Sequence, residues 1–307
     1  MNFKKHLQSI IIVFIIFFNA CAEGEWELIE AEYEPELIVF GLISLDPEVD
    51  SFVHVYRSLS LSEKAEIFAQ VDSFLYDGVV YRDSIYGPAG LIKNAQVSVT
   101  TNGISTPFDF VPRQNYWSPE ANFYIDTIGT FKPQPSTTYF LDVTVPGYNP
   151  VKGELLTPEI PVLIDSLIQD TISVKRNYKI VWKKINEGKG ILTGRIGEVK
   201  YSEVSGNFLG CDPDFDRVVN LQDGIYTVPT KICEDRQLEI IEPLPFKIGL
   251  TTIDENYYKY FIRGEEGGYS NFLLGAGTTG GRSVGIYGGL GVFCSIATTQ
   301  LDVILDD

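Results

Sequence analysis

The segment AQVSVTTNG, residues 95–103, alternates apolar and polar side chains and ends in an Asn-Gly pair. Alternation with a period of two is typical of a half-buried β-strand. Asn-Gly between two such strands is the strongest short signal for a β-hairpin. Phe108 and Phe110 would then line one face of the return strand. We therefore expect an antiparallel hairpin here and a mainly β fold around it.

The same strand pattern recurs on both sides of the hairpin. The apolar run LIVFGLIS at 37–44 fits a buried strand, and residues 139–145 alternate like the first hairpin strand. Short strands with turn signals between them indicate an antiparallel sandwich of immunoglobulin-like size, which would occupy residues 37–157. Four prolines in residues 146–161 predict a domain boundary near 157–162.

An insertion near 61–88 interrupts the first expected domain. Ser60 and Glu63 have the spacing of a capping box. Apolar residues then recur at helical spacing until Gly78. We expect a short amphipathic helix at about 61–76, packed on a sheet.

The second expected domain, residues 158–307, keeps strand-like patterns and contains one helical segment. Thr252 and Glu255 have capping-box spacing beside the tyrosine-rich stretch IDENYYKYF at 253–261. A Gly-rich C-terminal segment follows, and glycine favours loops and tight turns. The sequence therefore predicts a second mostly-β domain with one short helix.

The N-terminus has the three-part pattern of a secretory signal. A basic start precedes the apolar run IIIVFIIFF at 10–18, which is shorter than the roughly 20 residues that a bilayer requires. Asn19 and Ala20 then lead into Cys21, which resembles the cleavage box of bacterial lipoproteins. By that resemblance residues 1–20 are removed and Cys21 is acylated, and several acyl chains on one residue anchor a protein stably. The alternative is an ordinary signal peptide with a chance cysteine.

Charge and cysteine usage limit the possible partners. Residues 21–36 contain acidic side chains and no Lys or Arg, which predicts an extended, self-repelling tether. The whole chain has a formal net charge of −17, so it is not expected to bind nucleic acid, whose phosphates require Lys and Arg. Cys211 and Cys233 form a candidate disulfide, worth about 3 kcal/mol by loop entropy. Cys294 lies in an apolar run and is expected to be a buried thiol.

Several segments together suggest a family. They occur in the order LIVFGLIS (37–44), IKNAQVSVT (92–100), IDENYYKYF (253–261) and GGLGVFCSIAT (288–298) after the lipoprotein leader. In this order they resemble the Bacteroidota lipoproteins of domain-of-unknown-function family 4249. The resemblance implies a lipid-anchored outer-membrane protein that is encoded beside a TonB-dependent receptor. It implies no catalytic residues. The insertion near 61–88 and the Gly-rich segment 264–281 depart from the family pattern.

Two catalytic motifs lack the context that they need. Residues 281–285 match G-x-S-x-G around Ser283, but a hydrolase of that class needs a histidine after the serine. Beyond the leader the chain has only His54, which precedes the serine. Residues 275–280 match G-x-G-x-x-G, but the glycines that follow disfavour the helix that a nucleotide site requires. We expect no catalytic residues and no cofactor.

A third pattern imitates a calcium loop. Its members are Asp212, Asp214, Asp216 and Asp223. Arg217 stands where the loop requires glycine, and Pro213 stiffens its start. The sequence contains no CxxC pair, so a zinc site is not expected either. An ordinary acidic loop is therefore favoured over a metal site.

Aromatic side chains provide the remaining candidate contacts. Tyr116 and Trp117 lie in a segment flanked by Asn and Pro, and such side chains can anchor a partner or a ligand. Packing within the protein is the favoured interpretation of this pair.

Three functions remain open at this stage. The first is a non-catalytic binding or accessory protein, anchored to the outer membrane through Cys21 and associated with a TonB-dependent transporter. The second is a glycan-directed envelope hydrolase with two carboxyl groups about 5–9 Å apart. The third is a structural or adhesive surface protein, which the lack of internal repeats disfavours. The sequence leaves open the ligand, the face of the membrane and the oligomeric state.

Overall fold

The computed structural model describes residues 33–60, 62–76, 79–112, 122–197, 208–209, 211–233, 236–263 and 283–307. Residues 35–307 form one compact unit, which consists mostly of strands with one short helix. Within the described ranges, no helix is long and apolar enough to cross a membrane.

One mixed sheet contains most of the strands. These are β1 (Leu37–Ser44), β2 (Phe52–Arg57), β5 (Gln96–Thr101), β6 (Ile104–Val111), β7 (Phe123–Ile125), β8 (Thr138–Thr144), β9 (Val151–Leu156), β10 (Thr171–Ser173), β12 (Lys189–Ile196), β14 (Phe215–Asn220), β19 (Leu244–Ile253), β20 (Ser283–Val284), β21 (Ile286–Tyr287) and β22 (Leu290–Asp306). Their order is β14-β12-β19-β22-β1-β2-β7-β6-β5-β8-β9-β21, and β10 and β20 also pair with β22.

Four two-stranded ribbons and three short helical segments complete the described part. The ribbons are β3 (Glu66–Tyr76) with β4 (Val79–Pro88), β11 (Tyr178–Val181) with β15 (Ile225–Val228), β13 (Phe208–Leu209) with β18 (Glu239–Ile240), and β16 (Ile232–Cys233) with β17 (Arg236–Gln237). The helical segments are η1 (Asp165–Leu167), α3 (Glu255–Tyr257) and the π-helical η2 (Tyr258–Ile262).

The hairpin expected around residues 95–103 is confirmed. Strands β5 and β6 pair antiparallel, with Thr101 opposite Ile104. Asn102 and Gly103 both have positive φ, 49° and 77°. A two-residue turn of the I′ type requires this conformation because its twist matches the flanking strands. The predicted strand at 37–44 is β1, with the same bounds.

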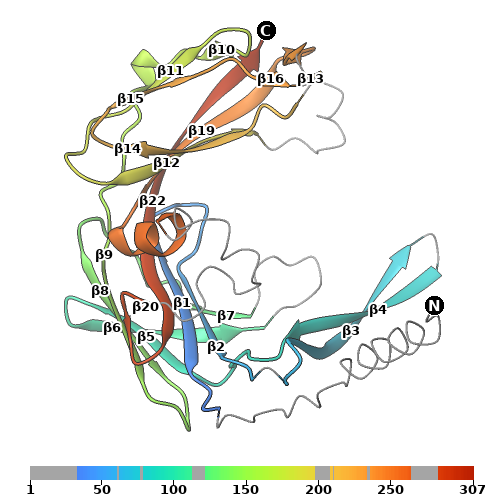
Figure 1. The fold of residues 1–307 in the computed structure, drawn as a ribbon, viewed down its shortest axis with the longest axis vertical. Coiled ribbons are helices and arrows are strands. Elements are labelled where there is room, and N and C mark those ends of the chain that lie inside the picture. The colour runs from blue at the N-terminus through green and yellow to red at the C-terminus, as the bar shows by residue number, and fades with distance from the viewer. Residues whose placement is uncertain are drawn as a thin grey trace, which may run out of the picture. The chain divides into compact units, whose positions relative to one another are not determined.

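The 17-residue strand β22 takes part in both halves of the sheet (Figure 1). Its residues 290–296 pair in parallel with β1, whereas residues 296–305 pair antiparallel with β19. The two largest of the three hydrophobic clusters in the described residues lie along it. One contains Phe293 with Leu37 and Leu141, and the other contains Leu305 with Trp182. A single strand therefore contributes side chains to both clusters.

Phe293 fills a space that two glycines leave open. A Cβ atom added at Gly41 would lie 2.7 Å from the Phe293 ring, and one added at Gly153 would lie 3.0 Å from the same side chain. Phe293 is fully buried. Glycine is therefore required on both neighbouring strands, β1 and β9, for the ring to pack.

The prediction of a mainly β fold with one short helix is confirmed. The finer prediction of an immunoglobulin-like sandwich is not confirmed, because the strands of residues 37–157 continue through β1 and β22 into one large, curled mixed sheet. Period-two alternation identifies strands, but it does not determine which strands pair across a long sequence separation. The predicted domain boundary near 157–162 stays a prediction.

The helix predicted at about 61–76 is wrong. Residues 66–76 form β3, which pairs antiparallel with β4. Apolar residues at 67, 68, 71, 74 and 75 fit a helical period by chance, and the Asp77-Gly78 pair between the two strands in the sequence is a typical hairpin dipeptide. The Ser60–Glu63 contact does form, with the Ser60 amide donating to the Glu63 carboxylate at 2.8 Å, but no helix follows it.

The second predicted helix forms, with a different N-cap. Asp254, rather than Thr252, caps α3, because its Oδ1 accepts the Tyr257 amide at 2.7 Å. The Ser295 hydroxyl donates to Asp254 Oδ2 at 3.0 Å, and the Thr252 hydroxyl instead donates to the Glu159 carbonyl at 2.6 Å. Burial raises the pKa of the Asp254 carboxyl to about 7, although its hydrogen bonds from Tyr257 and Ser295 favour the charged form.

We expect Phe293→Ala to lower the free energy of unfolding by about 3–5 kcal/mol, because truncating a buried Phe leaves a cavity. The measurement is urea unfolding followed by circular dichroism. Phe140→Ala is the matched control, since Phe140 on β8 is 44% exposed and should cost less than about 1 kcal/mol. Equal losses in the two variants would contradict the central role of Phe293.

We expect Asp254 to make the protein less stable as the pH rises. Its pKa is about 7 in the folded state and near the ordinary value of 3.8 in the unfolded state, so between these values the folded state binds the extra proton. This contribution is complete below about pH 4 and is lost by about pH 7. The difference corresponds to about 4 kcal/mol.

The check is to measure the free energy of unfolding from pH 4 to pH 8 in the wild type and in Asp254→Asn. Asparagine still caps a helix but does not titrate, so the variant should lose most of this pH dependence. Asp50→Asn, at an exposed loop position, should keep the wild-type profile. A parallel decline in all three proteins would refute the assignment to Asp254.

Candidate functional site

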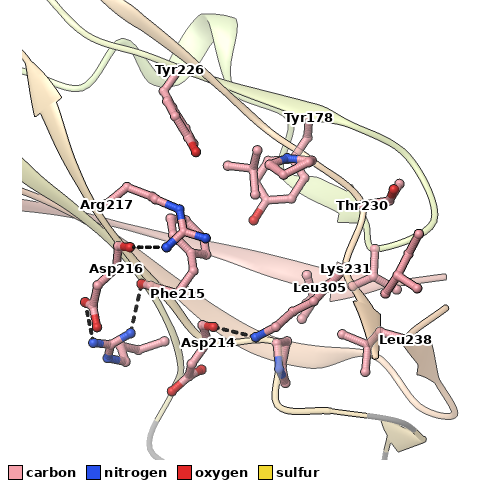
Figure 2. A pocket seen from close by; sticks show the side chains of 16 residues that line it. Tyr178, Asp214, Phe215, Asp216, Arg217, Tyr226, Thr230, Lys231, Leu238 and Leu305 are labelled. Atoms are coloured by element: carbon pink, nitrogen blue, oxygen red, sulfur yellow. Dashed lines mark hydrogen bonds and ion pairs between the residues drawn. The ribbon is translucent and has the colours of Figure 1, made fainter. Parts of the chain in front are cut away.

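A pocket of about 740 Å³ opens beside the second hydrophobic cluster (Figure 2). Volumes of 300–1,000 Å³ are typical of sites for small organic molecules. Strands β14 and β15 supply five of its 16 lining residues, β11, β12, β16 and β22 supply one each, and the loops between strands supply the other seven. Half of the 16 lining residues are polar or charged, so the pocket is more polar than the usual site for a small organic molecule.

The β11–β15 ribbon forms the aromatic wall of the pocket. Tyr178 lies opposite Val228, and Tyr226 lies opposite Ile180. Residues opposite each other in an antiparallel pair share a face, so both tyrosines lie on the same face as the buried Ile180 and Val228. The hydrophobic packing of these two residues thus holds the ribbon in place and directs both phenol rings inward.

The two hydroxyl groups point into the pocket (Figure 2). Within the described part of the chain, neither the Tyr178 nor the Tyr226 hydroxyl has a hydrogen-bond partner. Burial raises the pKa of Tyr178, and the neighbouring Tyr226 raises it further. Tyr178 is therefore neutral at physiological pH and available as a hydrogen-bond donor.

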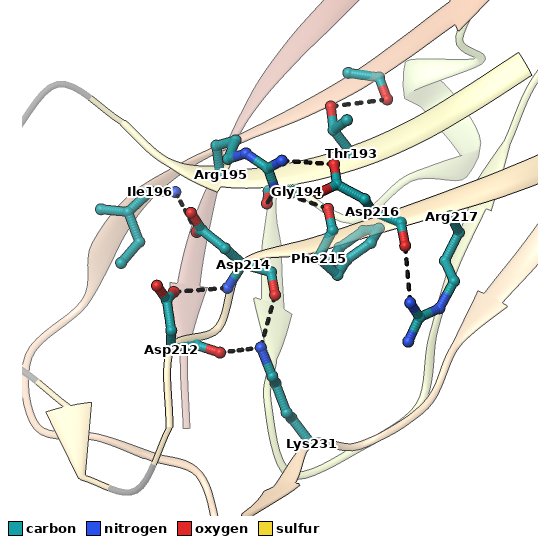
Figure 3. A network of polar contacts seen from close by, with 11 residues as sticks. Thr193, Gly194, Arg195, Ile196, Asp212, Asp214, Phe215, Asp216, Arg217 and Lys231 are labelled. Carbon is teal, nitrogen blue, oxygen red and sulfur yellow. Dashed lines mark hydrogen bonds and ion pairs between the residues drawn. The ribbon is translucent and has the colours of Figure 1, made fainter. Parts of the chain in front are cut away.

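Arg195 fixes the opposite wall (Figure 3). Its Nη1 donates to the Phe215 carbonyl at 2.9 Å, and its Nη2 donates to Asp216 Oδ1 at 2.5 Å. The hydrogen bond to Asp216 raises the pKa of the Arg195 guanidinium. Because the arginine contacts both the main chain and the side chain of β14, it ties that strand to β12 and neutralises Asp216.

Lys231 crosses from the far rim to the segment before β14. Its ammonium donates to the main-chain carbonyls of Asp212 and of Asp214, the latter at 2.6 Å. Burial lowers the pKa of Lys231, and the nearby Asp212 and Asp214 charges act in the opposite direction. Burial also raises the pKa of Asp214, whose Oδ1 accepts the Ile196 amide at 2.9 Å.

These contacts explain the aspartate spacing that resembles a calcium loop. The Asp212 carboxylate accepts the Asp214 amide at 2.9 Å, Asp214 accepts from Ile196, and Asp216 pairs with Arg195. The three carboxylates thus have three different partners. Across the described residues, no group of three or more His, Cys, Asp or Glu side chains could hold a metal ion. The alternating aspartates fix the main chain around the pocket.

The structure places the cysteines as follows. Cys211 is disulfide-bonded. The side chain of Cys233 lies outside the described residues, so the Cys211–Cys233 pairing stays a prediction. Cys294 is a free, buried cysteine, as predicted, and burial raises the pKa of its thiol.

The remaining candidate residues are not brought together. Ser283 lies on β20, where its hydroxyl donates to the Gly289 carbonyl at 2.7 Å. His54 lies on β2, with its Nδ1 3.1 Å from the Asn122 carbonyl. Cys21, Tyr116, Trp117 and the G-x-G-x-x-G segment 275–280 lie outside the described residues.

A second hollow of about 1,230 Å³ is lined partly by Glu154, Asp254 and Glu255. The alternative function, a carboxylate-based hydrolase, would have its catalytic pair here, because a carboxyl group with a pKa of about 7, such as that of Asp254, can act as a general acid. However, both Asp254 oxygens are occupied by the helix cap and by Ser295. The carboxyl group therefore has a structural role in the helix that already accounts for its position.

Most pocket residues were not predicted as site residues from the sequence. Arg217 was noted only as a departure from the calcium pattern. A usable signal was present, since Arg195, Arg217 and Lys231 are cations in a strongly acidic chain. Their convergence depends on the pairing of β12, β14 and β15 with their neighbours, which spacing along the chain does not reveal.

Comparison with known proteins adds a family. A family model described as "Domain of unknown function (DUF4249)" matches residues 25–268. This range includes every residue that lines the pocket except Leu305. No curated protein gives a significant match.

Proposed function

The chain belongs to the DUF4249 family, and from that premise we propose that it is a non-catalytic binding protein of the outer membrane. In this proposal it is anchored through acylated Cys21 and works as an accessory subunit of a TonB-dependent transporter. The leader and the acidic segment 21–36 support the anchor. The observation that carries the binding role is the pocket with two tyrosine hydroxyls that have no hydrogen-bond partner among the described residues.

The arrangement of the pocket supports binding rather than chemistry. Asp214 and Asp216, the carboxylates that line it, are held by the Ile196 amide and by Arg195. A general base needs a carboxylate within reach of the proton that it removes. Here Asp214 is held by a main-chain amide and Asp216 by an arginine side chain, and the tyrosine hydroxyls, Arg217 and Lys231 offer donors to a ligand. Such a site holds a molecule without activating it.

The β3–β4 ribbon supports a contact with a partner. Five of its apolar side chains are more than half exposed, and they are Ile67 (53%), Phe68 (55%), Val71 (53%), Val80 (61%) and Tyr86 (57%). Phe68 and Tyr86 lie opposite each other. Their ring centroids are 6.2 Å apart in an edge-to-face arrangement, which aromatic pairs prefer. The paired Phe68 and Tyr86 form an exposed apolar patch, and exposed apolar patches are typical of protein interfaces. We propose that the transporter covers this ribbon.

The base of the ribbon is fixed to the sheet. Arg57 on β2 forms a bidentate ion pair with Glu63, at 2.6 and 3.0 Å, and the Arg57 amide donates to the Gly90 carbonyl at 2.7 Å. The ion pair lowers the pKa of Glu63 to about 2. A ribbon fixed at its base can present its apolar side chains to a partner in a constant position.

We expect the C-terminally tagged chain, extracted in mild detergent with Cys21 intact, to co-purify a TonB-dependent barrel in near-stoichiometric amount. Mass spectrometry of the eluate is the measurement. Cys21→Ser should abolish palmitate labelling and release the protein from the membrane fraction. Recovery of the lipidated chain alone would count against the transporter association, and labelling of the serine variant would count against Cys21 as the acylated residue.

We expect the double change Phe68→Ser and Val71→Ser to reduce co-purification of the barrel at least tenfold, since buried apolar anchors dominate binding energy. The matched control is Ile128→Ser, at a position that is 73% exposed and lies between β7 and β8. Unchanged thermal unfolding would show that both variants fold. Full retention of the barrel by the double variant would exclude the ribbon as the contact.

A further inference from the structure

The pocket contains two cations without a carboxylate partner. In the part of the chain that the structure describes, Arg217 donates to the Asp216 carbonyl at 2.8 Å, and Lys231 donates to the two main-chain carbonyls described above. Neither forms an ion pair with a carboxylate, whereas Arg195 does so with Asp216. This is unexpected in a chain with 41 acidic and 24 basic side chains.

The two cations also repel each other. The Arg217 charge lowers the pKa of Lys231, although burial has a larger effect and the Asp212 and Asp214 charges act in the opposite direction. Both side chains reach into the same pocket (Figure 2). An anion bound between them would relieve this repulsion and would use guanidinium and ammonium donors that the protein leaves free.

The tyrosine hydroxyls on β11 and β15 can also donate hydrogen bonds. The Tyr178 and Tyr226 hydroxyls have no partner among the described residues, and Tyr178 stays protonated because burial raises its pKa. One oxygen of each carboxylate in the wall is already engaged, since Asp214 Oδ1 accepts the Ile196 amide and Asp216 Oδ1 accepts from Arg195. A ligand that supplies acceptor oxygens would use the donors of Arg217, Lys231 and the two tyrosines.

Apart from Thr230, the rest of the lining is apolar. Val174, Val228, Leu238 and Leu305 are buried side chains that border the pocket, and Phe215 packs beside them. An inorganic anion would leave this surface uncovered, and a pocket of about 740 Å³ has room for a larger molecule. The ligand therefore combines an anionic group with an apolar body.

We propose that this pocket binds a small organic acid, with its carboxylate held by Arg217 and Lys231 and its apolar body against Tyr178, Phe215 and Leu238. The inference rests on the proposed function, because it takes the chain to be a binding protein, and it adds the chemical class of the ligand. Arg217 is the specificity-determining residue, since a planar guanidinium matches a carboxylate through two parallel hydrogen bonds.

The test is isothermal titration calorimetry on the full chain in detergent, with micelle blanks and three probes. We expect 4-phenylbutyrate to bind saturably, and its neutral analogue 4-phenylbutanamide and inorganic phosphate each to bind at least tenfold more weakly. Arg217→Gln should weaken phenylbutyrate binding about tenfold to a hundredfold, because a hydrogen bond to a charged group is lost. Lys231→Gln should act in the same direction.

Lys179→Gln is the matched control, because Lys179 lies on the outer, exposed face of β11 and its loss removes the same charge. It should leave the affinity unchanged, and equal thermal unfolding would show that all variants fold. The inference is overturned if phenylbutyrate does not bind below millimolar concentration, if Arg217→Gln binds it normally, or if either other probe binds as tightly. Equal binding of the amide would show that the pocket binds ligands without preferring acids. Co-purification of the transporter is a separate measurement, so it tests the proposed function independently of this inference.

Discussion

The pairing of β22 with β1 is the interaction on which the rest of the structure depends. It joins the first and last strands of the described sheet in parallel, from Ile38 opposite Leu290 to Ser44 opposite Ile296. The same strand then continues antiparallel to β19. Because Phe293 and Leu305 belong to different hydrophobic clusters, the two clusters are linked by one continuous main chain. The glycines at 41 and 153 make room for Phe293. The packing of β22 in the first cluster therefore depends on these small residues as well as on the large phenylalanine.

Local patterns predicted the strands better than they predicted the sheet. Residues 37–44 and the Asn102-Gly103 turn were identified correctly because their signals depend on nearest neighbours and on backbone conformation. The β3 strand was mistaken for a helix because five apolar positions fit a helical period by chance. The mixed sheet was not anticipated because parallel pairing between distant strands leaves no local signature. The short helix was located correctly, but its cap was assigned to Thr252 instead of Asp254, two positions further on.

The candidate site was less predictable than the fold for the same reason. Its aspartates were noticed as a pattern, but their carboxylates serve the main chain of Ile196 and Asp214 and the side chain of Arg195. The groups without such contacts are the cations Arg217 and Lys231 and the hydroxyls of two tyrosines. These groups can be identified only after the hydrogen-bond partners of the neighbouring aspartates are known. Residue identity and spacing do not reveal those partners, whereas the pairing of β11, β12, β14 and β15 does.

The parallel contact of β1 with β22 also constrains the order in which the chain acquires its structure. Gly41 and Cys294, which lie 253 positions apart, are joined by a hydrogen bond from the thiol to the carbonyl. Until the last strand has been synthesised, β1 has an open edge and the first cluster lacks Phe293. A chain that emerges from its N-terminus therefore cannot complete either cluster before its C-terminal strand is made. Contacts of such long range also fold slowly, which leaves the edge of β1 exposed for that time.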